Sequence, residues 1–230
     1  SWCNSNNMSL SVSKTKLRYI SSRHKQQTLA NFDHDISIYD SKIQVKSVKK
    51  LLGVTISNTL CWDGHIDYLI KKCNSYLFLL SRKNVVVFYQ NEHNTILPYL
   101  DVCCIIWGNC NSTFDDKLEI SKEAARVILD CDLYNPSSEL FKELNWQTFP
   151  KRVTYQKAIL MYRIVNNICP GYLKNYVSDT RSTNCNQLYT PTPNCELFRK
   201  SFMYSGAAIW NSLPLHVEIQ LPLTLLNLYI

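Results

Sequence analysis

The sequence predicts an α+β fold, in which a small antiparallel β-rich N-terminal portion precedes a mainly α-helical body. Between residues 15 and 56, polar and apolar residues alternate in short runs separated by polar breaks, and this period of two is typical of half-buried strands. After Asn58 the apolar residues recur at spacings of three and four, as they do along the buried face of a helix. No period of about 20 to 50 residues repeats, so a solenoid is not expected.

Several short strands are expected in the N-terminal portion. The run from Thr15 to Ile20 alternates at period two, and the runs ISIY and KIQV follow it. The two residues between those runs, Asp40 and Ser41, fit the loop of a two-residue hairpin. We expect Val48 to Ile56 to pair beside this hairpin as a further strand.

The longest expected helix follows Asp63, whose side chain can cap its first turn. Apolar residues at positions 66, 69, 70, 73, 77 and 80 predict an amphipathic helix of about five turns. Lys71, Lys72 and Arg82 fall on its other faces.

Further helices are expected along the rest of the chain, at residues 92–107, 114–129, 137–144, 153–166, 169–177 and 201–212. Pro98 is expected to bend the first of these helices. Asn135 and Pro136 are expected to serve as the cap and first-turn proline of the third. Residues 178–196, with two prolines and many small polar side chains, predict a loop-rich stretch.

The sequence shows no catalytic motif and no metal-binding motif. The ten cysteines include no Cys-x-x-Cys pair, and the five histidines are dispersed, whereas structural zinc needs ligands that meet at one point. We therefore expect reduced, buried thiols that act as small hydrophobic residues. Asp115 and Asp116 are the only adjacent carboxylates. Neighbouring residues on a helix point about 100° apart, so this pair fits a helix N-terminus better than a metal.

Positive charge is concentrated near the N-terminus. The whole chain has a formal net charge of +7, and residues 1–56 contain nine lysines and arginines against three aspartates. A basic segment interleaved with strand-like apolar residues commonly follows a phosphate backbone, where each neutralised phosphate releases counterions. The alternative is an ordinary solvated surface.

Four motifs, preceded by Trp2, occur in an order that is similar to a known family. They are LSVSKTKLRYI (Leu10 to Ile20), LLGVTISNTLCWDGHI (Leu51 to Ile66), LPYLDVCCIIWG (Leu97 to Gly108) and SFMYSGAAIWNSLP (Ser201 to Pro214). Together they resemble the C-terminal part of the reverse transcriptase of non-LTR (LINE-type, jockey-like) retrotransposons, over about residues 1 to 214. Beyond Pro214 the chain departs from the pattern of that family.

The resemblance implies three parts: the end of the polymerase palm with its primer-grip hairpin (1–60), a helical thumb (61–132) and a C-terminal helical domain (133–230). It implies a fragment of an RNA-directed DNA polymerase that binds a template-primer duplex without sequence preference. The metal-binding carboxylates of the family are expected upstream, so this chain alone is not expected to polymerise. The resemblance therefore implies the upstream palm and fingers as partners, and magnesium for that catalytic part; no cofactor is expected in this chain.

The resemblance also implies which residues bind nucleic acid. Lys14 stands in the place of a palm lysine that can donate a proton or positive charge to the leaving pyrophosphate. Leu52 and Gly53 are similar to the primer grip, where glycine permits close approach of a strand. Trp62 and His65 resemble anchors between this hairpin and the first thumb helix, with packing alone as the alternative. The implied binding residues are Lys14, Lys16, Lys49, Lys50, Leu52, Gly53, Lys71 and Lys72. For the lysines, a solvated surface is the alternative.

Two other functions stay open at this stage. One is a degenerate or co-opted helical domain, derived from a retroelement, that binds other proteins. The other is an unrelated metal or redox protein that uses its ten cysteines. The sequence has no signal peptide and no apolar run near the roughly 20 residues of a membrane helix. We therefore expect an intracellular protein of the nucleus or cytoplasm, without a membrane partner.

Overall fold

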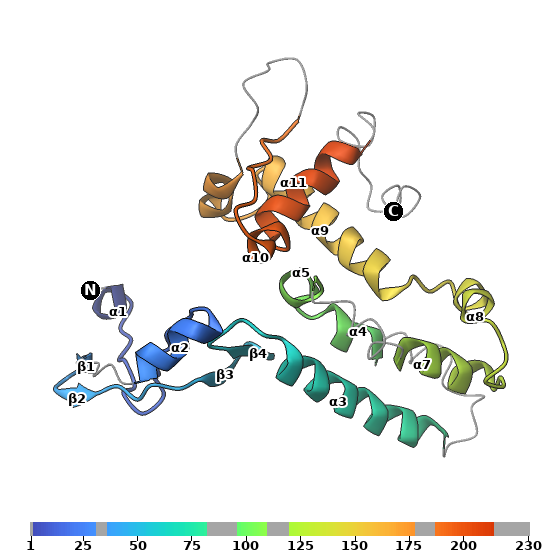
Figure 1. Ribbon diagram of the computed structural model, residues 1–230, viewed down its shortest axis with the longest axis horizontal. Helices are drawn as coiled ribbons and strands as arrows, with labels where there is room; N and C mark the ends of the chain where they lie inside the picture. The colour runs from blue at the N-terminus through green and yellow to red at the C-terminus, as the bar shows by residue number, and fades with distance from the viewer. Residues whose placement is uncertain (1, 31–35, 82–95, 110–119, 178–186, 214–230) are drawn as a thin grey trace. The chain divides into compact units, whose positions relative to one another are not determined.

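The computed structural model describes residues 2–30, 36–81, 96–109, 120–177 and 187–213 (Figure 1). Two antiparallel hairpins and a larger set of helices make up these residues, which confirms the α+β class. The chain divides into two compact units, Ser1–Tyr68 and Leu69–Ile230. The division falls inside one long helix, α3 (Asp63–Ser81). The assignment of palm and thumb stays a prediction.

The first unit contains all the strands of the described residues. Its elements before α3 are α1 (Trp2–Ser5), α2 (Arg23–Ala30), β1 (Ser37–Ile38), β2 (Ser41–Lys42), β3 (Val48–Leu51) and β4 (Val54–Ser57). The strands form two separate two-stranded sheets, β1–β2 and β3–β4. The described parts of the two hairpins are therefore not strand neighbours, contrary to the expected pairing.

The turn of the first hairpin lies one residue earlier than predicted. Ile38 pairs with Ser41, so the loop residues are Tyr39 and Asp40 rather than Asp40 and Ser41. Both have positive φ angles, 48° and 59°, as a type I′ turn requires. This turn twists in the same sense as the strands that it joins, and that match selects the register.

The single strand predicted from Val48 to Ile56 is in fact a second hairpin. Leu51 pairs with Val54, and the intervening Leu52 and Gly53 have φ angles of 47° and 89°. These angles again define a type I′ loop, in which glycine accepts a positive φ without steric cost. The glycine therefore reverses the chain instead of lying within an extended strand.

The strand predicted from Thr15 to Ile20 is reduced to an isolated parallel bridge. Leu17 bridges Val45, because its N–H donates to the Gln44 carbonyl (3.0 Å) and its carbonyl accepts from the Lys46 N–H (3.0 Å). Ile20 is exposed. The alternating pattern thus places this segment beside residues 44–46 without extending a ladder.

Helix α3 has 19 residues, which confirms the predicted helix of about five turns. Ile66, Leu69, Cys73 and Leu77 are buried and recur at spacings of three and four, as one face of a helix requires. Asp63 is the first residue of the helix, where its negative charge favours the helix dipole.

The second helical region is broken at a place other than the predicted one. It consists of α4 (Ile96–Asp101) and α5 (Cys104–Trp107), separated at Cys103, whose φ angle is 54°. Pro98 lies in the first described turn of α4, a position where its missing N–H is tolerated. The predicted residues 92–95 lie outside the described residues.

The remaining helices belong to the second unit. They are α7 (Ile120–Leu129), α8 (Ser137–Glu143), α9 (Phe149–Val165), the 3-10 helix η2 (Gly171–Tyr176), α10 (Glu196–Arg199) and α11 (Phe202–Ser212). The N-cap of α8 is Pro136 rather than the predicted Asn135. Helix α9 begins four residues before the predicted Val153, with Thr148 as N-cap and Pro150 in the first turn, a position that suits proline.

The packing of α9 against α11 explains the Trp-Asn-x-Leu-Pro motif as far as Leu213 (Figure 1). Trp210 is 1% exposed and packs in a cluster that includes Met161 and Leu188. Asn211 holds the backbone of Leu188 twice: its Oδ1 accepts from the Leu188 N–H (2.8 Å), and its Nδ2 donates to the Leu188 carbonyl (2.8 Å). The motif thus supplies a core side chain, Trp210, and a side chain, Asn211, that holds the backbone at Leu188.

Candidate nucleic-acid interface

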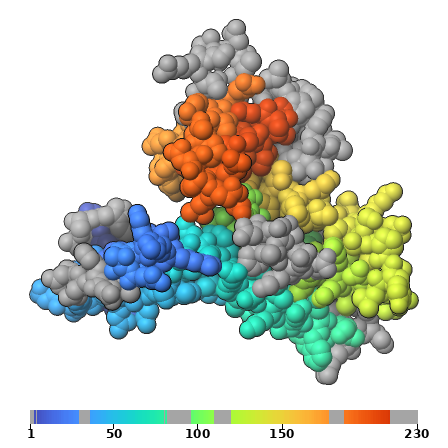
Figure 2. All heavy atoms as spheres, in the orientation of Figure 1, coloured from blue at the N-terminus to red at the C-terminus, as the bar shows by residue number. Residues whose placement is uncertain are grey.

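Hairpin β3–β4 presents two lysines on its two faces. All four residues of β3 are exposed. Figure 2, coloured by residue number, shows part of the surface of the first unit in blue to cyan. Because successive strand residues point to opposite faces, Lys49 and Lys50 turn in different directions. Lys49 Nζ donates to the Lys14 carbonyl (2.9 Å), whereas Lys50 Nζ donates to the Tyr68 hydroxyl (2.9 Å). Lys50 Nζ also lies 4.0 Å from the Tyr68 ring centroid, a cation–π distance.

Lys14 and Lys16 approach the same hairpin from a turn that precedes Leu17. The Thr15 N–H and hydroxyl both donate to the Ser11 carbonyl (2.9 and 2.8 Å), which fixes this turn. Lys16 Nζ donates to Gln44 Oε1 (2.9 Å). The structure therefore brings Lys14 and Lys49 together, and it holds Lys16 beside the strand bridge of Leu17.

The ammonium groups of Lys16, Lys49 and Lys50 have neutral hydrogen-bond partners, whereas Lys14 takes part through its backbone carbonyl. Within the described residues, no carboxylate forms an ion pair with Lys14, Lys16, Lys49 or Lys50. A hydrogen bond to a carbonyl, an amide or a hydroxyl leaves the positive charge uncompensated. Lysines with uncompensated charge, of which Lys14, Lys49 and Lys50 are exposed and Lys16 is half-buried, attract a phosphate backbone.

The tip of the hairpin is apolar. Leu52 is 88% exposed and has a positive φ, and the neighbouring Leu51 is also exposed. A leucine is a poor residue for this conformation, where asparagine or glycine is preferred. Because Leu52 is poorly suited to this turn, its presence points to a role other than folding.

His65 fastens the hairpin to the beginning of α3. Its imidazole is 1% exposed, and Nδ1 accepts from the Thr55 N–H of β4 (3.3 Å). Burial, and after it the charge of Lys50, lowers the pKa of His65. Trp62 is half-buried, and its carbonyl accepts the N–H groups of His65 and Ile66 (3.0 and 2.9 Å). The predicted anchor is thus the His65 side chain, whereas Trp62 contributes backbone hydrogen bonds.

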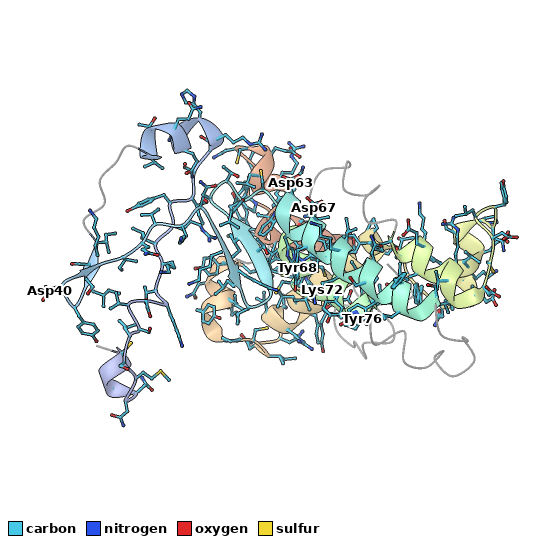
Figure 3. All side chains as sticks on the ribbon, turned by 90° about the horizontal axis from the view of Figure 1, so that it is seen from below. Asp40, Asp63, Asp67, Tyr68, Lys72 and Tyr76 are labelled. Carbon is cyan, nitrogen blue, oxygen red and sulfur yellow. The ribbon has the colours of Figure 1, made fainter. Side chains whose placement is uncertain are left out.

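Lys71 and Lys72 lie on the part of α3 that belongs to the second unit, and both are exposed. Tyr68, Lys72 and Tyr76 follow one side of this helix (Figure 3), as the spacing of four requires. Arg82 lies outside the described residues. The exposed lysines agree equally with a phosphate-binding helix and with a solvated face.

Sequence reasoning missed the side chains that hold the lysines, because Tyr68 and Gln44 resemble any other surface residue in the sequence. It also missed a pair beside α3: Arg23 Nη2 donates to Cys61 Sγ (3.5 Å). The pKa of Cys61 is lowered, first by a hydrogen bond with Thr59 and next by Arg23. No sequence signal marks these contacts.

The cysteine prediction holds at some positions only. Cys73 and Cys104 are buried, and burial raises their thiol pKa values to about 11 and about 12. Cys103 and Cys195 are exposed, so the prediction of buried thiols is wrong there. Cys110 and Cys185, like Asp115 and Asp116, lie outside the described residues. Across the described ranges, no three His, Cys, Asp or Glu side chains come together as metal ligands.

The second unit contains a buried lysine that the sequence did not single out. Lys157 is 2% exposed, its Nζ donates to Ser205 Oγ (3.1 Å), and burial lowers its pKa to about 8. Ser205 donates to the Ser201 carbonyl (2.8 Å) and also accepts from Asn109 Nδ2 (3.4 Å). The network joins α9, α11 and the segment after α5. The sequence could have indicated this burial, because Lys157 lies four residues from both Val153 and Met161, which are buried on the same face of the helix.

Comparisons with protein-family models, with curated proteins and with solved structures find no match. No helix among the described residues is long and apolar enough to cross a membrane.

Proposed function

We propose that the first unit binds a nucleic-acid duplex through its phosphates, without reading the base sequence. The observation that carries this proposal is the group of lysines around β3. The ammonium groups of Lys16, Lys49 and Lys50 bond to neutral groups, and within the described residues neither they nor Lys14 pair with a carboxylate. Phosphate contacts of this kind position a protein on a duplex and carry no sequence information. The apolar tip at Leu52 adds a surface that a duplex end or an exposed base can contact.

The resemblance to non-LTR retrotransposon reverse transcriptases supports an RNA/DNA template-primer duplex as the ligand. In that proposal, hairpin β3–β4 is the primer grip, α3 begins the thumb, and Lys14 assists the leaving pyrophosphate. Lys71 and Lys72 then contact phosphates from α3. The upstream palm and fingers of the parent polymerase are the protein partners.

Magnesium belongs to the parent polymerase in this proposal. Two-metal phosphoryl transfer needs carboxylates that hold both ions, and the described residues form no such group. Because the resemblance places those carboxylates upstream, we propose no catalytic step in this chain. A primer-extension assay of this chain with magnesium is expected to give no product, and clear extension would contradict the proposal.

Fluorescence anisotropy with a labelled RNA/DNA duplex tests the binding itself. The double variant Lys49→Glu and Lys50→Glu should weaken binding at least about tenfold at low salt, and it should flatten the dependence of log K on log salt by about two. The matched control is Lys142→Glu with Lys151→Glu, which makes the same charge change at two exposed positions of α8 and α9. Equal weakening in the two double variants would show a net-charge effect and would remove the proposed site.

A protein-interaction domain of retroelement origin is the second candidate. Leu133 and Tyr134, between α7 and α8, are 79% and 96% exposed, and exposed apolar side chains that adjoin one another favour contacts with another protein. Absence of duplex binding by the unaltered chain would favour this candidate over the first.

A further inference from the structure

The register of hairpin β3–β4 leaves the Thr55 amide facing away from β3. Leu51 and Val54 flank the two-residue loop, and Lys50 pairs with Thr55 one step further. In an antiparallel hairpin of this type, the flanking pair is hydrogen-bonded and the next pair is not, so the N–H of the next pair points outward. The Thr55 N–H is thus an edge donor of β4, and edge donors need a partner.

His65 supplies that partner through a nitrogen that must be unprotonated. The Thr55 N–H donates to Nδ1 at 3.3 Å, and the imidazole is 1% exposed. In a neutral imidazole one ring nitrogen accepts and the other carries the proton, whereas both nitrogens of the imidazolium are donors. The contact therefore requires the neutral tautomer with its proton on Nε2.

The charges around His65 oppose its protonation. Lys50 of β3 is the described charged group that acts on the imidazole, and like burial it lowers the pKa of His65. Strand β4 (Val54–Ser57) contains no titratable side chain. On its own helix, Asp63 and Asp67 are exposed, and neither contributes to the shift. A protonated His65 ring would be a buried cation close to Lys50, the residue of β3 that pairs with Thr55.

We propose that His65 is an acid-sensitive latch: protonation of its imidazole turns the acceptor of the Thr55 amide into a donor and releases β4 from the first turn of α3. The latch goes beyond nucleic-acid binding and does not depend on it. Acid weakens the attachment of β4 to the first turn of α3, whereas the hydrogen bonds between β3 and β4 are not affected.

Amide hydrogen exchange of Thr55, measured by NMR on the full chain, tests the latch. Below the ordinary imidazole pKa of about 6.5, opening with proton uptake becomes about tenfold more favourable per pH unit. The protection factor of Thr55 should therefore fall about fivefold from pH 6.5 to 5.5, and more steeply below that. In His65→Asn, whose amide oxygen is an acceptor that does not titrate, it should stay constant. The control His24→Asn, an exposed histidine on α2, should behave as the unaltered chain.

Two outcomes would overturn the latch. One is a protection factor of Thr55 in the unaltered chain that does not change with pH. The other is an equal fall in His65→Asn, because the acid sensitivity would then arise elsewhere. If His65→Asn does not fold, the ¹⁵N shifts of the His65 ring in the unaltered chain decide: the latch requires the Nε2–H tautomer at pH 7.5, and an Nδ1–H tautomer would contradict it.

Discussion

The two units use lysine in opposite ways. In the first unit, Lys49 and Lys50 are exposed and donate hydrogen bonds to neutral groups. Among the described residues of this unit, the buried apolar side chains are only Ile43, Val54 and Ile66. In the second unit, Lys157 is enclosed among α9, α11 and the segment after α5. A surface lysine keeps its charge available to a ligand, whereas a buried lysine costs stability unless it is neutral or well paired.

The same contrast extends to what holds each unit together. The second unit packs large side chains, among them Trp107 stacked on Phe149 with ring centroids 5.1 Å apart. The first unit depends more on polar contacts, such as Gln26, whose Nε2 donates to the carbonyls of Tyr19 and Asn58 (2.9 and 3.0 Å). We infer that the second unit is the more stable of the two.

The largest expected effect is at the core of the second unit. Trp210→Ala removes a fully buried indole from the contact of α9 with α11, and it should lower the free energy of unfolding by about 3–5 kcal/mol. Urea unfolding followed by circular dichroism measures this change. Tyr134→Ala, at a side chain that is 96% exposed, is the control and should change the free energy by less than about 0.5 kcal/mol. A small effect of Trp210→Ala would break the contrast between the two units.

The next largest expected effect is a gain in the free energy of unfolding. Lys157→Met replaces a buried ammonium by an apolar side chain of similar length, and it should raise the free energy of unfolding at pH 7 by about 1–3 kcal/mol. The pKa of Lys157 is about 8 in the folded chain against an ordinary 10.5. Between these values the unfolded state binds more protons, so the stability of the unaltered chain should rise with pH.

The advantage of Lys157→Met should therefore shrink as the pH rises from 8 towards 10.5. Urea unfolding at pH 7, 8.5 and 10 measures the difference between the two chains, which removes the effect of other titrating groups. A difference that is constant with pH would mean that Lys157 is not held in a site that disfavours its charge.

The smallest expected effect is at the tip of hairpin β3–β4. Leu52→Asn gives the type I′ loop its preferred Asn-Gly sequence and should stabilise the first unit by about 0.5 kcal/mol. It should also weaken duplex binding, because the exposed apolar tip is lost. Thermal unfolding and anisotropy on the same sample measure both quantities. Stabilisation without any loss of binding would show that Leu52 does not contact the ligand.

The parts of the fold that follow from periodicity could be predicted from the sequence. The buried face of α3 is visible in the spacing of Ile66, Leu69 and Cys73, since a helix repeats its face every three or four residues. Turn registers could not be predicted in the same way. Tyr39 adopts a positive φ that its type disfavours, and only the pairing of the strands imposes it. The break at Cys103, where φ is 54°, likewise has no signal in the apolar periodicity.

The candidate site shows the same division. Charge along the sequence pointed to Lys14, Lys49 and Lys50, because a basic segment is visible in composition. The partners of these lysines were not predictable, since Tyr68 approaches Lys50 only after the hairpin and α3 have folded. Lys157 escaped notice for a related reason: lysine is normally exposed, so its place on the same helix face as Val153 and Met161 was not considered.

Lysine footprinting with an RNA/DNA duplex tests whether the lysines around β3 contact the phosphates of a duplex. Individual lysines are acetylated with and without the duplex, and the rates are compared by mass spectrometry. We expect Lys14, Lys49 and Lys50 to react at least about threefold more slowly in the complex, because phosphates cover uncompensated cations. Lys142 and Lys151, which are also exposed, should keep their rates. Protection of Lys142 and Lys151 alone, or uniform rates at all five lysines, would contradict it.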